Sequence, residues 1–341
     1  VSDEGGFTYE KNVTLSVNDI NDNPSLISLL LRSDQLEVTQ IGSTIDGEAE
    51  YGYSGYQVSL SSDGSLLAVS EPFNSFNGSY SGSVRLYKNV AGSWHQLGDS
   101  IYGAEGDEFG LSASISADGS TVAIGSPYSS NTGQVSLYEI SDESWQLITE
   151  INGIGEGDLS GYSTNLSSDG NLLVIGSPGS DANGISSGLV TLFEKDSDGS
   201  WSQISDDIRG ESGDRLGTSV SFSADGTVFA VSAPQGGMFA EGSGDESGYV
   251  RLYHQDSDLN WVQVGGDIPG EAAYDHTGNF LSLSSDGNIV AIGSTENDGN
   301  GEDSGHVRIY QNIEGIWQQI GEDIDGEAAG DFSGPISLSA D

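Results

Sequence analysis

The chain has 341 residues, with 53 Asp and Glu against 9 Lys and Arg, a formal net charge of −44, and no cysteine. Such an acidic surface repels phosphate backbones and anionic lipid heads, which argues against nucleic acid and membrane surfaces as partners. The lack of cysteine excludes disulfides, thiol nucleophiles and cysteine-ligated metal centres. No apolar run approaches the roughly 18 residues of a membrane-spanning helix.

The excess of negative charge opposes a compact fold unless salt or bound cations screen it. One interpretation is a solvated surface adapted to salt. The other is that many carboxylates bind Ca²⁺, which prefers oxygen ligands and is the cofactor we expect. Both interpretations indicate an extracellular, calcium-rich medium.

The first 24 residues differ from the rest of the chain. Val1-Ser-Asp-Glu-Gly-Gly6, followed by Val13-Thr-Leu-Ser-Val-Asn-Asp-Ile-Asn-Asp-Asn-Pro24, resembles the end of a cadherin-type repeat and its linker. In that family the linker binds Ca²⁺ between successive domains. The resemblance implies Ca²⁺ ligands at Asp19, Asn21, Asp22 and Asn23, with Asp3 a weaker candidate. The alternative is an Asx-rich turn that only separates two domains.

An internal repeat organises the remainder, residues 25–341. A Ser-Ser/Ala-Asp-Gly turn recurs about every 50–60 residues and is followed each time by an apolar run such as Thr121-Val-Ala-Ile-Gly125. A variable loop, an alternating strand such as Val84-Arg-Leu-Tyr87, and a tryptophan strand complete each unit. The turn aspartates are Asp63, Asp118, Asp169, Asp225 and Asp286, with Asp341 starting a sixth. The repeats span about 41–98, 99–148, 149–204, 205–264 and 265–320, with a partial repeat at 321–341.

The pattern within a unit predicts strands and no helices. Apolar and polar residues alternate with a period of two, and Asp-Gly favours a tight hairpin because Gly accepts positive φ. The second strand is apolar throughout, as expected when both of its faces are buried. We therefore predict an all-β fold in which four-stranded antiparallel blades stack radially as a β-propeller.

The two ends predict how the ring closes. Ser25-Leu-Ile-Ser-Leu-Leu-Leu31 and Leu36-Glu-Val-Thr-Gln-Ile-Gly42 match the last two strands of a unit, and Pro335-Ile-Ser-Leu-Ser339 matches a first strand. We expect the ends to share one closing blade, which favours six blades, although seven remain open. Residues 26–36 also fit a short helix. Because the last residues stop within a pattern that otherwise continues, we interpret the chain as part of a longer protein.

The repeat resembles a known family. Gly106-Asp-Glu-Phe-Gly110, followed by Ser116-Ala-Asp-Gly119 and Val122-Ala-Ile-Gly-Ser-Pro127, is similar to the FG-GAP repeat. That repeat builds the propellers of integrin α chains and of many large secreted microbial proteins. The resemblance implies an extracellular propeller. The DxDxDG calcium loop of integrin-type repeats is missing here, so the family's calcium ligands do not carry over to these turns.

Acidic residues concentrate in two sets of loops. The loop before each first strand is expected to place a ring of carboxylates on one face, or else each Asp caps its own turn by accepting backbone N–H bonds. These acids are Glu48, Asp107, Glu156, Asp158, Glu211, Asp214, Glu271, Asp275, Glu327 and Asp331. The loops between second and third strands offer weaker Ca²⁺ candidates, or are simply solvated. These candidates are Asp245, Asp298, Glu302 and Asp303, with Asp181 in a similar loop.

Catalytic motifs are missing from the sequence. The four histidines, His95, His254, His276 and His306, occupy different positions in their repeats, and no HExxH or GxSxG motif is present. A carboxylate pair of the glycosidase type cannot be recognised among so many acids. The chain is therefore predicted not to be an enzyme.

Three further residue sets complete the prediction. The tryptophans share one strand position, which favours packing between blades over sugar stacking. Arg85, Arg251 and Arg308 are expected on the solvent side of their strands. Asn12, Asn77 and Asn165 begin N-x-Ser/Thr sequons, relevant if the protein is secreted by a eukaryote.

We therefore expect a non-enzymatic structural or adhesion module of a larger surface protein or appendage. Its partners would be neighbouring domains of the same chain, other surface proteins or glycans, or further copies of itself. The alternatives are a glycan-binding lectin-like propeller and a polysaccharide-active enzyme.

Overall fold

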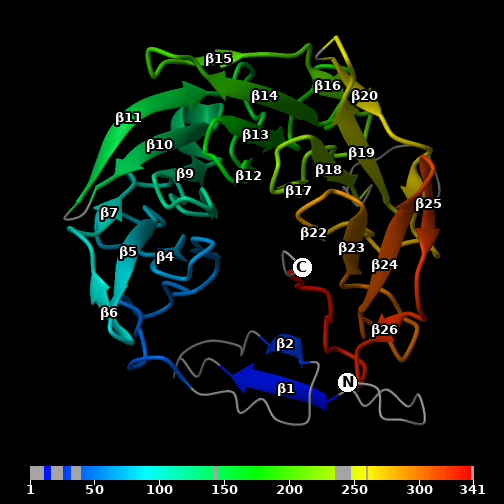
Figure 1. Ribbon diagram of the computed structural model, residues 1–341, viewed down its shortest axis with the longest axis horizontal. Helices are drawn as coiled ribbons and strands as arrows, with labels where there is room; N and C mark the ends of the chain where they lie inside the picture. Colours follow the sequence, from blue (N-terminus) through cyan, green and yellow to red (C-terminus); the bar gives the residue numbers. More distant parts are fainter. Residues whose placement is uncertain are drawn as a thin grey trace.

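The computed structural model describes residues 40–141, 144–234, 247–258 and 260–338, together with the backbone of residues 11–16 and 26–31. In these residues the chain forms five antiparallel sheets arranged radially around a common centre (Figure 1), each with four strands in order and, in four of them, a short fifth strand that pairs with the third. The first strand of each sheet lies nearest the centre, as β12, β17 and β22 show in Figure 1. The predicted β-propeller fold is confirmed, and the described part contains five blades.

The first blade contains β3 (Val58–Leu60), β4 (Leu66–Glu71), β5 (Ser83–Val90), β6 (Ser93–Gln96) and β7 (Ile101–Tyr102). The second contains β8 (Ser112–Ile115), β9 (Thr121–Ser126), β10 (Gln134–Ile140) and β11 (Trp145–Asn152). A 3₁₀ turn, η1 (Ser129–Asn131), interrupts the second blade. The third blade contains β12 (Ser163–Leu166), β13 (Leu172–Ser177), β14 (Leu189–Lys195), β15 (Trp201–Gln203) and β16 (Ile208–Arg209). The fourth contains β17 (Val220–Phe222), β18 (Val228–Ala233), β19 (Tyr249–Gln255), β20 (Trp261–Gln263) and β21 (Ile268–Pro269). The fifth contains β22 (Phe280–Leu283), β23 (Ile289–Ser294), β24 (His306–Ile313), β25 (Ile316–Gln319) and β26 (Ile324–Asp325).

The Asp-Gly turns form the predicted hairpins between first and second strands. In the first blade the Ser61 hydroxyl donates to Asp63 Oδ1 at 2.7 Å, and the Ser65 backbone N–H donates to the same atom at 2.9 Å. Gly64 takes a φ of +65°, a left-handed conformation that glycine adopts without a Cβ clash. The same serine-to-aspartate bond recurs in the other four blades.

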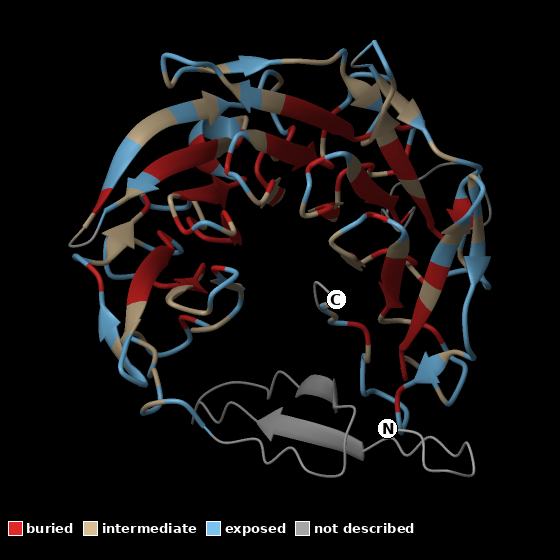
Figure 2. Ribbon diagram, viewed as in Figure 1, coloured by how far each residue is buried: buried red, intermediate tan, exposed pale blue. Residues whose placement is uncertain are grey.

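The core lies between the blades. The second and third strands are largely buried, as the red ribbons of Figure 2 show, and apolar clusters join each blade to the next. Four of the five tryptophans, Trp145, Trp201, Trp261 and Trp317, belong to these clusters, which confirms the predicted packing role for them. Trp145 Nε1 donates to Asp99 O at 3.2 Å, and Trp317 Nε1 donates to Val264 O at 3.1 Å, both across a blade boundary.

The arginines of the third strands correct one prediction. Arg85 and Arg308 are 5% and 4% exposed, and Arg251 is only partly exposed, so these side chains do not lie on a solvent face. Both faces of a third strand pack against neighbouring blades. Alternating side chains along the strand therefore all point to a buried side, and neither of the two faces is left to solvent. Arg85 Nη1 donates to Asp46 O at 2.9 Å, and Arg308 Nη2 donates to Pro269 O at 3.0 Å. Arg85 and Arg308 therefore each bind a carbonyl that precedes their own blade, whereas Arg251 pairs with the Asp267 carboxylate.

Polar bonds also link the first strands around the centre. Ser114 Oγ accepts the Leu166 backbone N–H at 3.1 Å, and Ser221 Oγ accepts that of Leu283 at 3.2 Å. Ser282 Oγ likewise accepts the Leu338 N–H at 2.9 Å. Residues 335–338 therefore occupy the place of a first strand in the next position of the ring, although they are not themselves part of a sheet.

The N-terminal strands pair with each other. β1 (Lys11–Ser16) and β2 (Leu26–Leu31) are antiparallel, with Lys11 opposite Leu31. Residues 26–31 are thus a strand and not the alternative helix, and the pair crosses the domain boundary expected near residue 24. Within the described residues β2 does not pair with residues 335–338, and the closing blade remains a prediction.

Several predicted sites lie outside the described residues: Asp3, Asp19, Asn21, Asp22, Asn23 and Asp245. Only the backbone of Asn12 is described. None of the described helical segments has the length and apolar character needed to cross a bilayer.

Candidate active site at the centre of the ring

The acidic loops before the first strands are held by aspartate caps. Asp107 Oδ2 accepts the Ala104 backbone N–H at 2.9 Å, and Asp158 Oδ2 accepts that of Gly155 at 2.7 Å. The equivalent aspartates of the later repeats, Asp214, Asp275 and Asp331, accept backbone N–H groups in the same way. Each of these carboxylates accepts a backbone N–H of its own turn, as expected if the aspartates cap the turns.

The residue after each cap adopts a strained backbone conformation. In the five capped repeats this residue is not glycine, yet its φ lies between 50° and 59°, and Tyr53, which follows Gly52 in the first repeat, has the same conformation. The left-handed region disfavours residues with a Cβ, and such strain concentrates at functional sites. The residues are Tyr53, Glu108, Leu159, Arg215, His276 and Phe332. The backbone geometry repeats while the side chain changes, so each repeat presents a different chemical group in an equivalent place.

These loops lead directly into the first strands, near the centre of the ring (Figure 1). Groups from the early repeats act on one another there. Burial, followed by the proximity of Tyr162 and Glu108, raises the pKa of Tyr56. Burial also raises the pKa of Glu108 and, together with the Glu108 charge, that of Tyr128. Side chains of three successive repeats therefore converge on one surface.

A hollow of about 160 Å³ continues this surface across the third, fourth and fifth repeats. His276 Nδ1 lies 2.6 Å from Glu296 Oε2, and the two side chains are 17% and 41% exposed. Arg215 lies on the same hollow and forms no salt bridge within the described part of the chain. The residues that line it are Tyr162, Arg215, Thr218, Pro234, His276, Asn279 and Glu296.

The geometry suits general acid–base chemistry. When Glu296 accepts the Nδ1 proton, the His276 imidazole is oriented and Nε2 is left with a lone pair. Such a nitrogen can take a proton from water, and the neighbouring carboxylate stabilises the imidazolium that forms. Arg215 adds a positive charge that can stabilise a developing oxyanion.

No motif in the sequence points to this site. His276 was set aside because the four histidines occupy different positions in their repeats. The repeat is intact in its backbone, and the candidate groups lie at a position whose residue type varies. Aligning the residue after each cap would have drawn attention to Glu108, Arg215 and His276.

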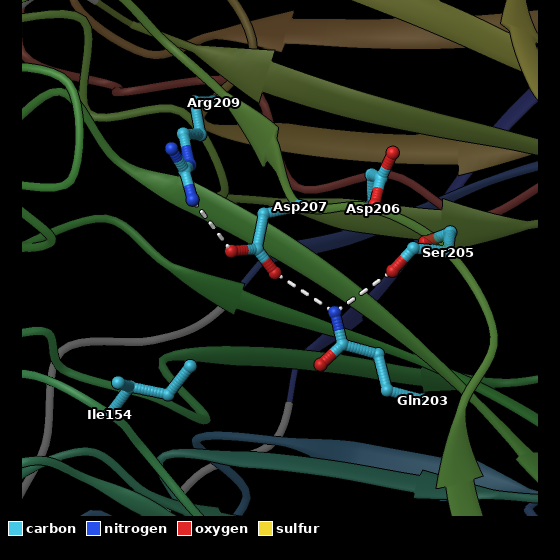
Figure 3. A pocket seen from close by; sticks show the side chains of 6 residues that line it. All are labelled: Ile154, Gln203, Ser205, Asp206, Asp207 and Arg209. Atoms are coloured by element: carbon cyan, nitrogen blue, oxygen red, sulfur yellow. Dashed lines mark hydrogen bonds and ion pairs between the residues drawn. The ribbon is translucent and has the colours of Figure 1, made fainter.

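A second hollow, of about 460 Å³, lies at the outer edge of the third blade (Figure 3). Gln203 Nε2 donates to Ser205 O and to Asp207 Oδ1, each at 2.9 Å, and Arg209 pairs with Asp207 at 3.0 Å. Across from them lies the apolar side chain of Ile154 (Figure 3). Asp207 already binds both Gln203 and Arg209, so this hollow is a weaker catalytic candidate than the central one.

The predicted calcium loop of the fifth repeat has a structural role. Asp298 Oδ1 accepts the Asp303 backbone N–H at 2.9 Å, as Asp181 Oδ1 accepts that of Ser186 at 2.7 Å. Asp298, Glu302 and Asp303 do not form a close group of ligand atoms in the described structure. Ca²⁺ binding by them remains a prediction.

Two sequon asparagines are used within the fold. Asn77 Nδ2 donates to Gly103 O at 2.8 Å, and Asn165 Oδ1 accepts the Phe222 backbone N–H at 2.8 Å. Both amides therefore hold neighbouring segments together.

Comparisons with known proteins support the fold. No protein-family model and no curated protein sequence matches the chain. Among solved structures it is similar to the periplasmic gluconolactonase PpgL of Pseudomonas aeruginosa, with 15% identity, a TM-score of 0.59, and coverage of 95% of this chain and 84% of that one. A candidate 6-phosphogluconolactonase from Bacteroides uniformis matches with 15% identity, a TM-score of 0.57, and coverage of 81% and 73%. A protein of unknown function from Desulfotomaculum acetoxidans matches with 14% identity, a TM-score of 0.56, and coverage of 88% and 77%.

These findings correct the predicted function. The expectation of a non-enzymatic structural or adhesion module is contradicted, because the similar structures include a gluconolactonase and a candidate 6-phosphogluconolactonase. They favour neither the FG-GAP repeat in particular nor cadherin-like adhesion. What the similarity establishes is the β-propeller fold of this chain.

Proposed function

We propose that the protein is a hydrolase that opens the cyclic ester of a sugar acid at the central hollow. The observation that carries this proposal is the His276–Glu296 pair at 2.6 Å, next to Arg215 on one hollow at the ring centre. The lactonase descriptions of two similar structures support the choice of substrate class. The hollow also offers Tyr162, Thr218 and Asn279 as hydrogen-bonding groups for sugar hydroxyls.

Each step of the reaction falls to a side chain of the site. His276 Nε2 removes a proton from water, and the water oxygen attacks the carbonyl carbon of the lactone. Arg215 stabilises the negative charge on the carbonyl oxygen of the tetrahedral intermediate. The intermediate collapses by breaking the bond between the acyl carbon and the ring oxygen. The imidazolium returns its proton to that oxygen, which gives the open hydroxy acid.

We infer that the protein works outside the cytoplasm. The lack of cysteine and the net charge of −44 support this location, as does the description of one similar structure as a periplasmic protein. An acidic surface of this kind repels anionic substrates at a distance. An uncharged lactone is therefore expected to be a better substrate than its phosphorylated form.

The test is lactone hydrolysis followed by acid release in a pH-stat, with glucono-1,5-lactone and its 6-phosphate as substrates. We expect hydrolysis above the spontaneous rate, and a loss of about 10²–10⁴-fold in kcat for His276→Gln, the range for general-base catalysis. Leu159→Gln is the matched control, since Leu159 has the same loop position outside the hollow. A rate equal to the buffer blank with both lactones, or full activity in His276→Gln, would overturn the proposal.

A further inference from the structure

A second group of chemically active side chains lies at the outer edge of the fifth blade, away from the central hollow. His306 begins β24, Asp323 precedes β26, and Glu271 follows β21 of the fourth blade. One ligand atom from each lies within 4.8 Å of the others. His306 Nδ1 is 3.7 Å from Asp323 Oδ2 and 3.9 Å from Glu271 Oε2.

The histidine of this group is buried without a hydrogen-bond partner. His306 is 1% exposed, and neither of its ring nitrogens is hydrogen-bonded. Buried polar nitrogens that lack partners are costly, so they need an explanation in a native fold. His306 Nδ1 lies within 4 Å of both carboxylates, where a bound ion would give this nitrogen the partner that it lacks.

The other blades show that this arrangement is particular to the fifth. The residue that pairs with the short outer strand is Ser83 in the first blade, Leu189 in the third and Tyr249 in the fourth, where the fifth has His306. In the third blade the corresponding place is the hollow of Figure 3, where Ile154 takes the position of Glu271.

The fourth blade shows how the acid is used when no histidine is present. Arg251 there binds Asp267, the counterpart of Asp323, through Nε at 2.9 Å and Nη2 at 3.0 Å. Asp323 has no such arginine in the described structure, although the Gln319 amide donates to its other oxygen. Within the described part of the chain, these three residues form the one group of His and acidic side chains close enough to share an ion.

We propose that Glu271, His306 and Asp323 bind a divalent transition-metal ion of the Zn²⁺ class between the fourth and fifth blades. An imidazole with two carboxylates suits Zn²⁺, whereas Ca²⁺ and Mg²⁺ take oxygen ligands. Two ligands at tetrahedral angles around Zn²⁺ lie about 3.4 Å apart. The observed 3.7 and 3.9 Å therefore require movements of a few tenths of an ångström, available to Glu271 and Asp323, which are 44% and 26% exposed.

Arg308 fits beside the ion without competing for the same oxygen. Its Nη1 lies 3.5 Å from Glu271 Oε1, which leaves Oε2 directed to the histidine side. The exposed side of the group leaves room for water as a further ligand. Because Glu271 lies in the connection from the fourth blade and the other two ligands lie in the fifth, the ion joins two neighbouring blades.

The experiment measures Zn²⁺ binding to the full chain by calorimetry in excess Ca²⁺ and Mg²⁺, which occupy the sites made of carboxylates alone. We expect one tight Zn²⁺ per chain and a rise in Tm that continues with Zn²⁺ concentration. Co²⁺ in place of Zn²⁺ should give visible d–d absorption that reports the nitrogen ligand.

Three variants decide the assignment. His306→Leu carries the residue that the third blade has at this position, and it should lose the tight site and the Co²⁺ spectrum. Asp323→Asn should weaken Zn²⁺ binding more than about 100-fold. That is a larger loss than the one caused by removing a residue that only hydrogen-bonds to a metal ligand. Asp267→Asn, the position-matched control in the fourth blade, should bind Zn²⁺ like the parent chain. Equal Zn²⁺ binding in the folded parent chain and in either site variant, or no tight site in the parent chain, would overturn the proposal.

Discussion

The buried ion pair of the first blade is the most demanding test of how this propeller is held together. Glu71 ends β4 and is fully buried, and Arg85 on β5 donates to it at 2.5 Å. Glu71 also accepts the Glu48 backbone N–H at 2.9 Å and the Asn74 amide at 3.0 Å. The equivalent second strands end in Ser or Ala, so the acid is particular to this blade.

Removing one partner leaves the other charge buried. Arg85→Met should therefore lower the free energy of unfolding by about 3–5 kcal/mol, the range for a broken buried pair. Glu71→Gln should have a comparable effect. The exposed pair of Arg209 and Asp207, with side chains 49% and 20% exposed, is the control, and Arg209→Met should change stability by about 0–1 kcal/mol.

Urea unfolding followed by tryptophan fluorescence measures these differences, and the double variant Glu71→Gln/Arg85→Met completes a mutant cycle. Since the double variant leaves neither charge unpaired, its loss should be smaller than the two single losses combined by at least about 1.5 kcal/mol. Additive losses, or an Arg85→Met effect no larger than that of Arg209→Met, would refute the reasoning that this charge pair is coupled and desolvated.

Three further predictions follow from the loops, the turns and the charge. A Cβ on Gly82 would lie 2.3 Å from the backbone N and O of Phe109, so Gly82→Ala should destabilise the fold by more than Gly92→Ala. Gly92 has open space around it, and its replacement is expected to cost about 1–2 kcal/mol for the left-handed φ alone. Equal melting temperatures of the two variants would contradict this prediction. Hydrogen bonds from the Ser61 hydroxyl and from Ser65 lower the pKa of Asp63 from 3.8 to about 2. The contribution of the Asp63 carboxylate to stability should therefore be complete above about pH 4 and lost as the pH falls through about 2. An Asp63 titration midpoint near 3.8 by NMR would disagree with this. Thermal melts in CaCl₂, MgCl₂ and NaCl at matched ionic strength test the expected calcium binding; a rise specific to Ca²⁺ supports liganded carboxylates, whereas an equal rise in all three leaves only screening of the −44 charge.

Local rules explain why the architecture could be predicted. The Ser-x-Asp-Gly turn closes its own hairpin through bonds within five residues, and the buried second strands follow from apolar runs in one segment. The aspartate caps also form within three residues of their donors. Because these features depend on short-range bonds and on a period of two, they could be predicted from sequence.

The two candidate sites depend on contacts that no short segment contains. His276 and Glu296 meet because a loop before the first strand and a loop after the second strand of one blade reach the same hollow. Glu271 and His306 meet only because one blade stacks against the next. The same stacking turns the expected solvent face of Arg85 into an interior. The blades follow from short-range sequence patterns. Which polar residues are buried and which meet depends on the radial packing of the blades, because that packing brings together residues from different loops and repeats.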